Sequence, residues 1–264
     1  MSASLGNSRF LDRLLPAPRK GGYRQADYWV WCGSPIRGDD GRYHLFASRW
    51  PRKYPFFLGY VTNSEVVRAV SDRPAGPYEF AELVLPARGR GFWDGMMTHN
   101  PCVLRYGSEY LLFYIGATYQ GRKPTAEELW RLERGATNEC YNSICIGLAT
   151  APSVTGPWTR RDEPVLRPRP GKWDGTVVTN PAPCVLSDGR LMMLYRSNTR
   201  DGLRLGAAIA ADPTAPFARL SDQPVLASTK QSYVEDPYLW QQHGRLHLLA
   251  KDWTGGFTGE KGGG

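Results

Sequence analysis

Short apolar runs alternate with turn residues along most of the 264-residue chain. Four times a small polar residue stands beside a proline and leads into an apolar run, and a turn and a second apolar run follow. A pattern that returns in this way indicates an array of similar structural units. The four steps are Gly33-Ser34-Pro35, His99-Asn100-Pro101, Thr179-Asn180-Pro181 and Glu235-Asp236-Pro237.

Each unit also has a repeated second half, in which an apolar run leads to a proline-containing turn and an aromatic residue. The turn Gly76-Pro77-Tyr78 corresponds to Gly156-Pro157-Trp158 and to Ala215-Pro216-Phe217. One unit therefore predicts about four short strands, which is the content of a β-propeller blade. A β-sandwich also has many short strands, but it does not need the same step four times. The sequence thus predicts an all-β propeller.

The pattern divides the chain into an N-terminal extension, residues 1–24, and one β-propeller domain, residues 25–264. A helical insertion is predicted at residues 123–136, because Thr125 and Glu128 form a capping-box pattern at its start. This insertion accounts for the longest spacing between two steps. The predicted blades begin near residues 28, 93, 173 and 233.

Composition narrows the choice of partner. A hydrophobic content of 41% is enough for one large domain, and no run approaches the roughly 18 apolar residues of a membrane span. Residues 1–22 show no apolar signal segment, which leaves the compartment open because a processed secreted protein would look the same. The net charge of +8 comes mostly from scattered arginines, so neither nucleic acid nor a membrane is the expected partner. An anionic sugar would be attracted by the same positive field.

The chain has five cysteines and no histidine–cysteine spacing typical of a metal site. Cys32, Cys102 and Cys184 lie close to three of the steps, where we expect small buried hydrophobic side chains. Cys140 and Cys145 flank a loop and are candidates for a disulfide. The residues themselves therefore indicate no cofactor.

Acidic residues recur near the steps. The sequence Trp-Asp-Gly occurs twice, with Asp94 and Asp174 each six residues before the asparagine of a step, and Asp27 precedes the first step. The fourth step itself contains Glu235 and Asp236. If blades close around an axis, these carboxylates converge on a central funnel, and a glycosidase needs two carboxylates of different proton affinity. Alternatively, an aspartate in such a turn only binds backbone amides.

Differences among the four steps point to chemistry more directly than their shared residues do. Glu235 and His99 are each unique to their blade, whereas Asp236 occupies the position of the small polar residue and has an equally good structural explanation. His99 is a candidate substrate ligand or acid, or else a histidine buried in the core. Four tryptophans are candidates for stacking on sugar rings or for packing between blades. These are Trp31, Trp50, Trp93 and Trp173.

Together these residues resemble the five-bladed β-propeller glycoside hydrolases of families 43 and 117. The segments that carry the resemblance are residues 28–35, 43–50, 93–101, 173–181 and 235–237, within a region of about 25–260. The resemblance implies a glycosidase that uses carboxylates in the central funnel, with inversion as the expected outcome. A calcium ion is also compatible with this fold, although no calcium-loop spacing is present.

The resemblance to family 43 implies three carboxylates with separate roles. Glu235 matches the general acid by its place before the proline of the fourth step, and Asp174 matches the carboxylate that modulates it, one blade earlier. Asp27 is the nearest candidate for the base, because the first step, Gly33-Ser34-Pro35, contains no carboxylate. Asp94, Asp236 and His99 are expected to contact substrate. Members of family 117 are thought to use a histidine as acid, which keeps His99 a candidate.

The sequence stops shortly after the second strand of the fourth unit, before a fifth. We therefore expect either a truncated piece of a longer protein or a second copy of the chain that completes the ring, because an open propeller exposes strand edges. The leading function is hydrolysis of oligo- or polysaccharides. The alternatives are a non-catalytic carbohydrate-binding propeller or inactive fragment, and a protein-interaction propeller, which would have apolar patches at the rim of the funnel.

Overall fold

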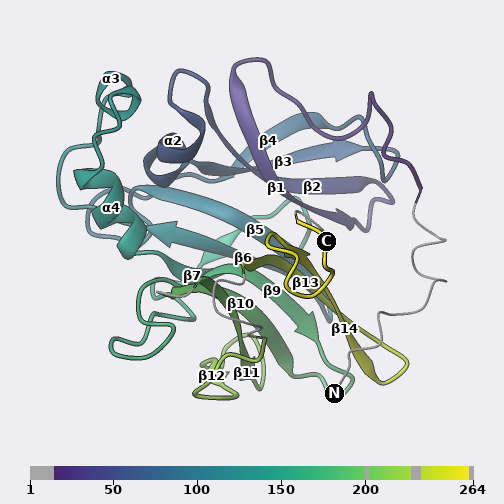
Figure 1. Ribbon diagram of the computed structural model, residues 1–264. Coiled ribbons are helices and arrows are strands. Elements are labelled where there is room, and N and C mark those ends of the chain that lie inside the picture. The colour runs from purple at the N-terminus through teal and green to yellow at the C-terminus, as the bar shows by residue number, and fades with distance from the viewer. Residues whose placement is uncertain (1–14, 200–201, 227–232, 262–264) are drawn as a thin grey trace.

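The computed structural model describes residues 15–199, 202–226 and 233–261, and the described part consists mainly of antiparallel sheets that follow one another along the chain (Figure 1). Blade one contains β1 (Tyr28–Arg37), β2 (Tyr43–Pro51), β3 (Glu65–Ser71) and β4 (Glu79–Leu85). Blade two contains β5 (Met97–Tyr106), β6 (Glu109–Ala117), β7 (Cys145–Ala151) and β8 (Thr159–Arg160). Blade three contains β9 (Thr179–Val185), β10 (Leu191–Thr199), β11 (Gly202–Ala210) and β12 (Ala218–Arg219). Blade four contains β13 (Val234–Gln242) and β14 (Arg245–Asp252).

The sheets have the topology of propeller blades, since consecutive strands pair as neighbours in each one. The strands β1, β5, β9 and β13 are the first of their blades, and β1 contacts β5, β5 contacts β9 and β9 contacts β13. The predicted all-β propeller is therefore confirmed. The two strands described for blade four agree with the sequence pattern, which shows only the first half of that unit.

Strand β6 is apolar on both faces because blade two packs against blade one on one side and blade three on the other. All residues of β6 from Tyr110 to Ala117 are buried, although side chains alternate between the two sides of a sheet. On one side, Phe46, Val66 and Leu85 of blade one pack with residues of blade two. A continuous apolar run that is bounded by turns is the expected pattern for such a strand.

In the described residues, three short helices lie outside the sheets, on the left of Figure 1. The predicted insertion begins as expected, because Thr125 and Glu128 form a capping box at the start of α3 (Ala126–Trp130). It continues into α4 (Gly135–Asn142), beyond the predicted end at residue 136. The sequence analysis missed α2 (Phe56–Asn63), which has no side-chain cap and no acidic residue in its first turn. Contacts with β2, β5 and α4 support this aromatic-rich segment as a helix.

The first strand of every described blade carries a β-bulge, in which two residues oppose one residue of the second strand. One bulged residue has a positive φ, which asparagine and aspartate adopt more readily than most residues. These residues are Cys32 (φ 54°), Asn100 (47°), Asn180 (49°) and Asp236 (52°).

The bulge corrects the alignment of the first step. Cys32, and not Ser34, occupies the position of Asn100 in blade one, and Gly33 stands where the other blades have proline. Pro35 misled the sequence comparison because it lies two residues beyond the matching position. The residues that precede the bulge in the four blades are Trp31, His99, Thr179 and Glu235.

Both Trp-Asp-Gly turns anchor a blade through a buried carboxylate. Asp174 is fully buried and accepts hydrogen bonds from Arg169 Nε (2.9 Å), Arg219 Nε (2.6 Å) and the hydroxyl of Tyr195 (2.8 Å). Although burial raises the pKa of Asp174, these donors hold it below its ordinary value. The tryptophan of the turn, Trp173, stacks on Tyr195 with ring centroids 5.9 Å apart.

The second blade repeats the arrangement around Asp94. This side chain is also fully buried and binds Arg88 (2.6 Å), Arg160 (3.0 Å) and the hydroxyl of Tyr114 (2.9 Å). Trp93 stacks on Tyr114 at 5.6 Å. Equivalent partners at equivalent positions show that the repeated motif is a structural element of the blade.

The N-terminal extension packs on blade one where it is described. Gly22 accepts a hydrogen bond from the amide of Tyr78 and donates one to Ala75, and Tyr23 forms an isolated bridge with Tyr78. Tyr23 is buried as a result. Residues 1–14 lie outside the described part.

Replacing Asp174 by asparagine is expected to lower the free energy of unfolding by about 3 kcal/mol, because two largely buried arginines lose their common anion. Asp222→Asn is the matched control, since Asp222 pairs with the same Arg169 but is 67% exposed. The control should change stability by less than about 1 kcal/mol. Urea denaturation measures both values, and equal losses in the two variants would contradict the anchoring role.

Candidate functional site

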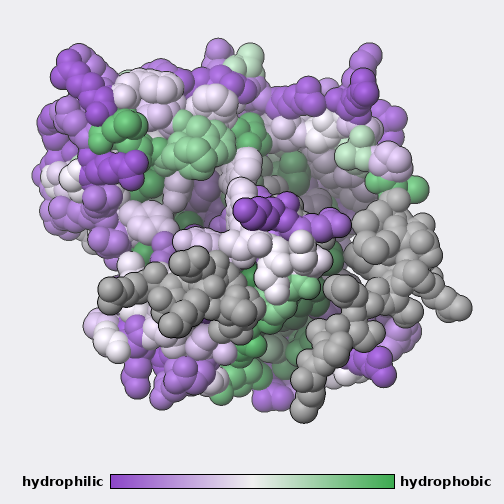
Figure 2. Space-filling view, in the orientation of Figure 1, coloured by the Kyte–Doolittle hydropathy of each residue, from purple (hydrophilic) through white to green (hydrophobic). Residues whose placement is uncertain are grey.

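Two adjoining cavities occupy the centre of the array, where the first strands of the four blades meet. One cavity, here called the upper cavity, is lined by His99, Glu235 and Trp253 among others and has a volume of about 230 Å³. The other, the lower cavity, is lined by Cys102 and Tyr238 among others and has a volume of about 440 Å³. In the space-filling view, hydrophobic side chains gather over α2 and the surface is hollowed beside them (Figure 2). Five residues line both cavities and therefore mark their boundary. These are Trp31, Cys32, Asn100, Asn180 and Asp236.

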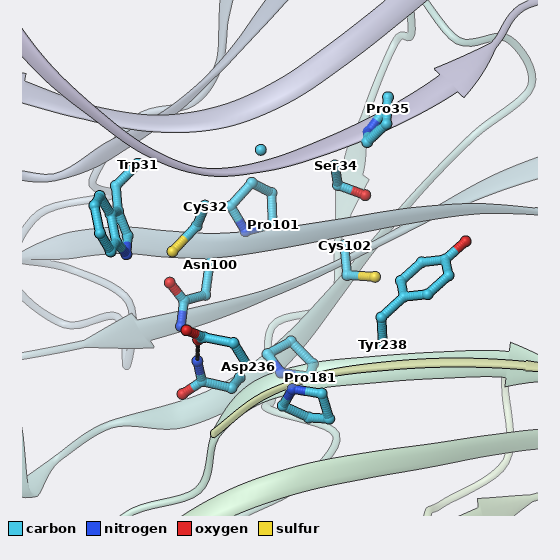
Figure 3. A pocket seen from close by; sticks show the side chains of 13 residues that line it. Trp31, Cys32, Ser34, Pro35, Asn100, Pro101, Cys102, Pro181, Asp236 and Tyr238 are labelled. Carbon is cyan, nitrogen blue, oxygen red and sulfur yellow. Dashed lines mark hydrogen bonds between the residues drawn. The ribbon is translucent and has the colours of Figure 1, made fainter. Parts of the chain in front are cut away.

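Four of these shared residues are the bulged residues with positive φ, so the bulge turns one side chain of each blade toward the centre. In Figure 3 the side chains of Cys32, Asn100 and Asp236 lie next to one another, while Cys102 and Tyr238 lie farther along the lower cavity. The amide nitrogen of Asn180 donates to Asp236 Oδ1 at 2.6 Å. Three polar side chains and a thiol therefore surround the boundary.

Glu235 lies beside this boundary, in the upper cavity. Its carboxylate accepts a hydrogen bond from the indole nitrogen of Trp253 and lies 3.9 Å from Arg196 Nε. Arg196 is held in turn by two amide oxygens, those of Asn180 (2.9 Å) and Asn198 (2.6 Å). The network links blade three to blade four across the cavity.

Asp236 has a different environment from its neighbour. Removal from bulk water and the adjacent Glu235 raise the pKa of Asp236, and Arg196, Lys251 and the hydrogen bond from Asn180 oppose the rise only in part. Among the described residues, Glu235 and Asp236 are the carboxylates that line the two cavities. The site therefore has two adjacent carboxyl groups with different hydrogen-bond partners.

His99 forms part of the upper cavity wall but is almost completely buried. Its Nδ1 is 2.7 Å from the hydroxyl of Ser64, its Nε2 is 3.9 Å from Cys32 Sγ, and its ring stacks on Tyr60. Burial lowers the pKa of His99 to about 3, so the imidazole is neutral at ordinary pH. Burial has the opposite effect on the Cys32 thiol: together with the nearby Asp236 and Glu235, it raises the pKa of Cys32 well above its ordinary value.

Aromatic rings form much of the cavity wall. Trp31 is 48% exposed and lies open to both cavities. Trp50 also lines the upper cavity but is 1% exposed, because it packs on Phe56, Tyr60 and His99. Trp253, at the end of β14, is 46% exposed.

The structure brings together only part of the predicted site. The residues that line the central cavities are Glu235, Asp236, His99, Trp31 and Trp50. Several predicted residues lie elsewhere. Asp27 is exposed at the turn before β1, and the other four belong to the two Trp-Asp-Gly anchors. These four are Asp94, Asp174, Trp93 and Trp173.

The structure does not bring Asp94 or Asp174 to the two central cavities, because both carboxylates are buried among arginine and tyrosine side chains. Sequence reasoning also missed Arg196, Lys251, Trp253 and Cys32. Arg196 stands out in hindsight as the charge that follows the apolar run of β10, Leu191 to Tyr195. Nothing local marked the other three as neighbours of Glu235.

All five cysteines are free thiols, so the disulfide considered for Cys140 and Cys145 is not formed. The described residues contain no cluster of three or more His, Cys, Asp and Glu that could hold a metal ion. None of the described helices is long and apolar enough to cross a membrane.

Comparisons with known proteins agree on the fold. No protein-family model and no curated protein matches the chain. Solved structures of glycoside hydrolases do match: Zg3597, a family 117 enzyme of the marine bacterium Zobellia galactanivorans, is 18% identical over 85% of this chain and 66% of its own, with a TM-score of 0.60. The Bacillus subtilis arabinanase Arb43A is 14% identical over 83% of this chain and 65% of its own, with a TM-score of 0.56.

A protein of unknown function from Dyadobacter fermentans is similar to the same degree, with 14% identity over 87% of this chain and 64% of its own and a TM-score of 0.60. The chain spans about two thirds of the length of these three proteins. The similarity confirms the predicted propeller fold of the family 43 and family 117 type. At these identities it establishes the fold and leaves the activity to the site.

The buried neutral His99 makes stability depend on pH. Its pKa is about 3 in the fold against about 6.5 in an unfolded chain, so stability is present above pH 6.5 and is lost as the pH falls toward 3. Between pH 7 and pH 5 the loss should be about 2 kcal/mol, because only the unfolded chain takes up this proton. His99→Asn should remove that part of the slope.

Denaturant titrations at the two pH values measure the slope for wild type and variant. His243→Asn is the matched control, because His243 is exposed and has a positive φ that asparagine tolerates. The control should keep the wild-type slope. An unchanged slope in His99→Asn would show that this histidine is not the group responsible.

Proposed function

We propose that this chain is a glycoside hydrolase whose active site is the upper central cavity. The observation that supports it is the pair Glu235 and Asp236, two adjacent carboxyl groups beside exposed aromatic rings, each with different polar partners. Glycosidases use two carboxyl groups of unequal proton affinity, one to protonate the leaving oxygen and one that acts as a carboxylate. The fold that this chain shares with family 43 and family 117 enzymes supports the same reaction class.

The surroundings favour Asp236 as the proton donor. Burial and the neighbouring Glu235 raise the pKa of Asp236, which favours a protonated carboxyl. Glu235 accepts a hydrogen bond from Trp253 and faces Arg196, and both contacts suit a negatively charged partner. This division differs from the roles expected from sequence, in which Glu235 was the acid and the exposed Asp27 the base.

Inversion was the outcome expected from the family resemblance. The spacing of the Glu235 and Asp236 carboxyl groups decides between the two outcomes, because carboxyls about 5 Å apart give retention and wider spacing leaves room for the water molecule of inversion. Proton NMR of the reaction distinguishes retention from inversion, because it identifies the anomer of the sugar that is released first.

A non-catalytic carbohydrate-binding propeller is the second candidate. Blade one has Cys32 at the bulge where the fourth blade has Asp236, and in the described residues no carboxylate faces the pair from blades one, two or three. Such a protein would use the same aromatic rings and polar side chains to bind a sugar without cleaving it.

Asp236→Asn is expected to lower kcat on aryl glycosides with poor leaving groups by about 10²–10⁴-fold, because general acid catalysis is lost. Activity on dinitrophenyl glycosides should be largely kept, since that leaving group departs without a proton. Glu235→Gln should lose activity on both substrates. Steady-state kinetics on the two aryl glycosides measures each effect.

Reversed results for the two variants would assign the acid to Glu235. Sugar binding by calorimetry with no product from wild type would instead favour the binding function. Thr179→Ala serves as a control that changes a neighbouring cavity residue without removing a carboxyl group.

A further inference from the structure

Lys251 is a cation in the cavity wall that the proposed reaction does not use. It lies directly opposite Glu235 in the pairing of β13 with β14, yet in the described part of the chain it forms no ion pair. Its ammonium nitrogen lies 3.3 Å from the ring centroid of Trp253, and the indole nitrogen of Trp253 binds Glu235. The indole ring thus holds Lys251 in place through a cation–π contact.

The charges of the cavity balance without Lys251. Its charged side chains in the described residues are Glu235, Asp236, Arg196 and Lys251. Arg196 faces Glu235 at 3.9 Å, and under the proposed function Asp236 holds its proton before the reaction and carries no charge. One positive charge, that of Lys251, is then left at the cavity wall for a ligand to neutralise.

Two further cations, Arg52 and Lys53, belong to the segment that leads into the aromatic wall of the cavity. Arg52 lies 4.1 Å over the ring of Trp29, and Trp29 packs edge-on against Phe56, which lines the cavity. Neither Arg52 nor Lys53 forms an ion pair within the described ranges. Residues 51–64, which carry the loop and α2, contain no aspartate or glutamate. An anionic ligand would therefore be attracted to this side of the cavity.

From this arrangement we propose that the cavity takes acidic sugars of the uronate class, with Lys251 as the side chain that binds the sugar carboxylate. This inference rests on the proposed carbohydrate function and specifies its substrate class. The ammonium offers three donors to the carboxylate, and the exposed faces of Trp31 and Trp253 offer apolar surfaces to the sugar ring. Lys251 is thereby a residue that determines specificity and takes no part in bond cleavage.

Binding of uronate oligosaccharides beside their methyl esters tests the proposal, because esterification removes the charge and keeps the backbone. The panel contains oligogalacturonate, oligoglucuronate and alginate oligomers, measured by calorimetry on the whole chain. At least one acid should bind about tenfold more tightly than its ester, the gain of one charge-assisted hydrogen bond. Added salt should weaken the binding of the acidic oligosaccharide and leave the binding of its ester unchanged.

Lys251→Met should abolish the preference for the acid over its ester. Only binding of the acid should weaken, since methionine keeps the apolar contact with Trp253. Lys251→Arg should retain most of the preference, and Lys172→Met, at an exposed turn outside the cavity, should change neither ligand. Equal binding of acid and ester by wild type would overturn the acidic specificity and leave the proposed function standing. Loss of both ligands in Lys251→Met would also overturn it, by showing a structural role. If no charged or neutral oligosaccharide binds, the proposed function fails as well.

Discussion

One backbone constraint determines what faces the centre of this molecule: the bulge near the start of the first strand of each described blade. Two residues there oppose one residue of the next strand, and one of them has a left-handed conformation. The bulge interrupts the alternation of side chains between the two faces of the sheet. It thereby places a cysteine, two asparagines and an aspartate around one point, although they come from residues 32, 100, 180 and 236.

The same repeated architecture explains why the aspartate of each Trp-Asp-Gly turn is buried and bound by several donors. Each Trp-Asp-Gly turn places its aspartate among two arginines and a tyrosine hydroxyl of its own surroundings. A buried carboxylate requires such partners, because the loss of hydration is otherwise uncompensated. Once those donors are satisfied, the aspartate fixes the approach to the first strand and has no accessible oxygen for a substrate.

The two walls of the cavity differ in the kind of group that each contributes. Blades one and two contribute neutral groups, among them a buried histidine and a thiol whose pKa is raised. Blades three and four contribute the charges, which are Arg196, Lys251 and the two carboxyl groups. The indole of Trp253 binds Glu235 through its nitrogen and Lys251 through its face. One aromatic side chain thereby keeps an anion and a cation apart at the same wall.

The sequence by itself determined the repeating blade and the place of the capped insertion, because strand period, turn residues and capping boxes are local signals. It also identified Glu235 and His99 as exceptions among the four steps. Only the tertiary structure decided which acidic residues meet. The shift of the first step to Cys32, the helix α2 and the contact of Lys251 with Trp253 depend on strand register and on packing between blades. No local pattern fixes these features, since the residues involved approach one another only when the sheets assemble around a common centre.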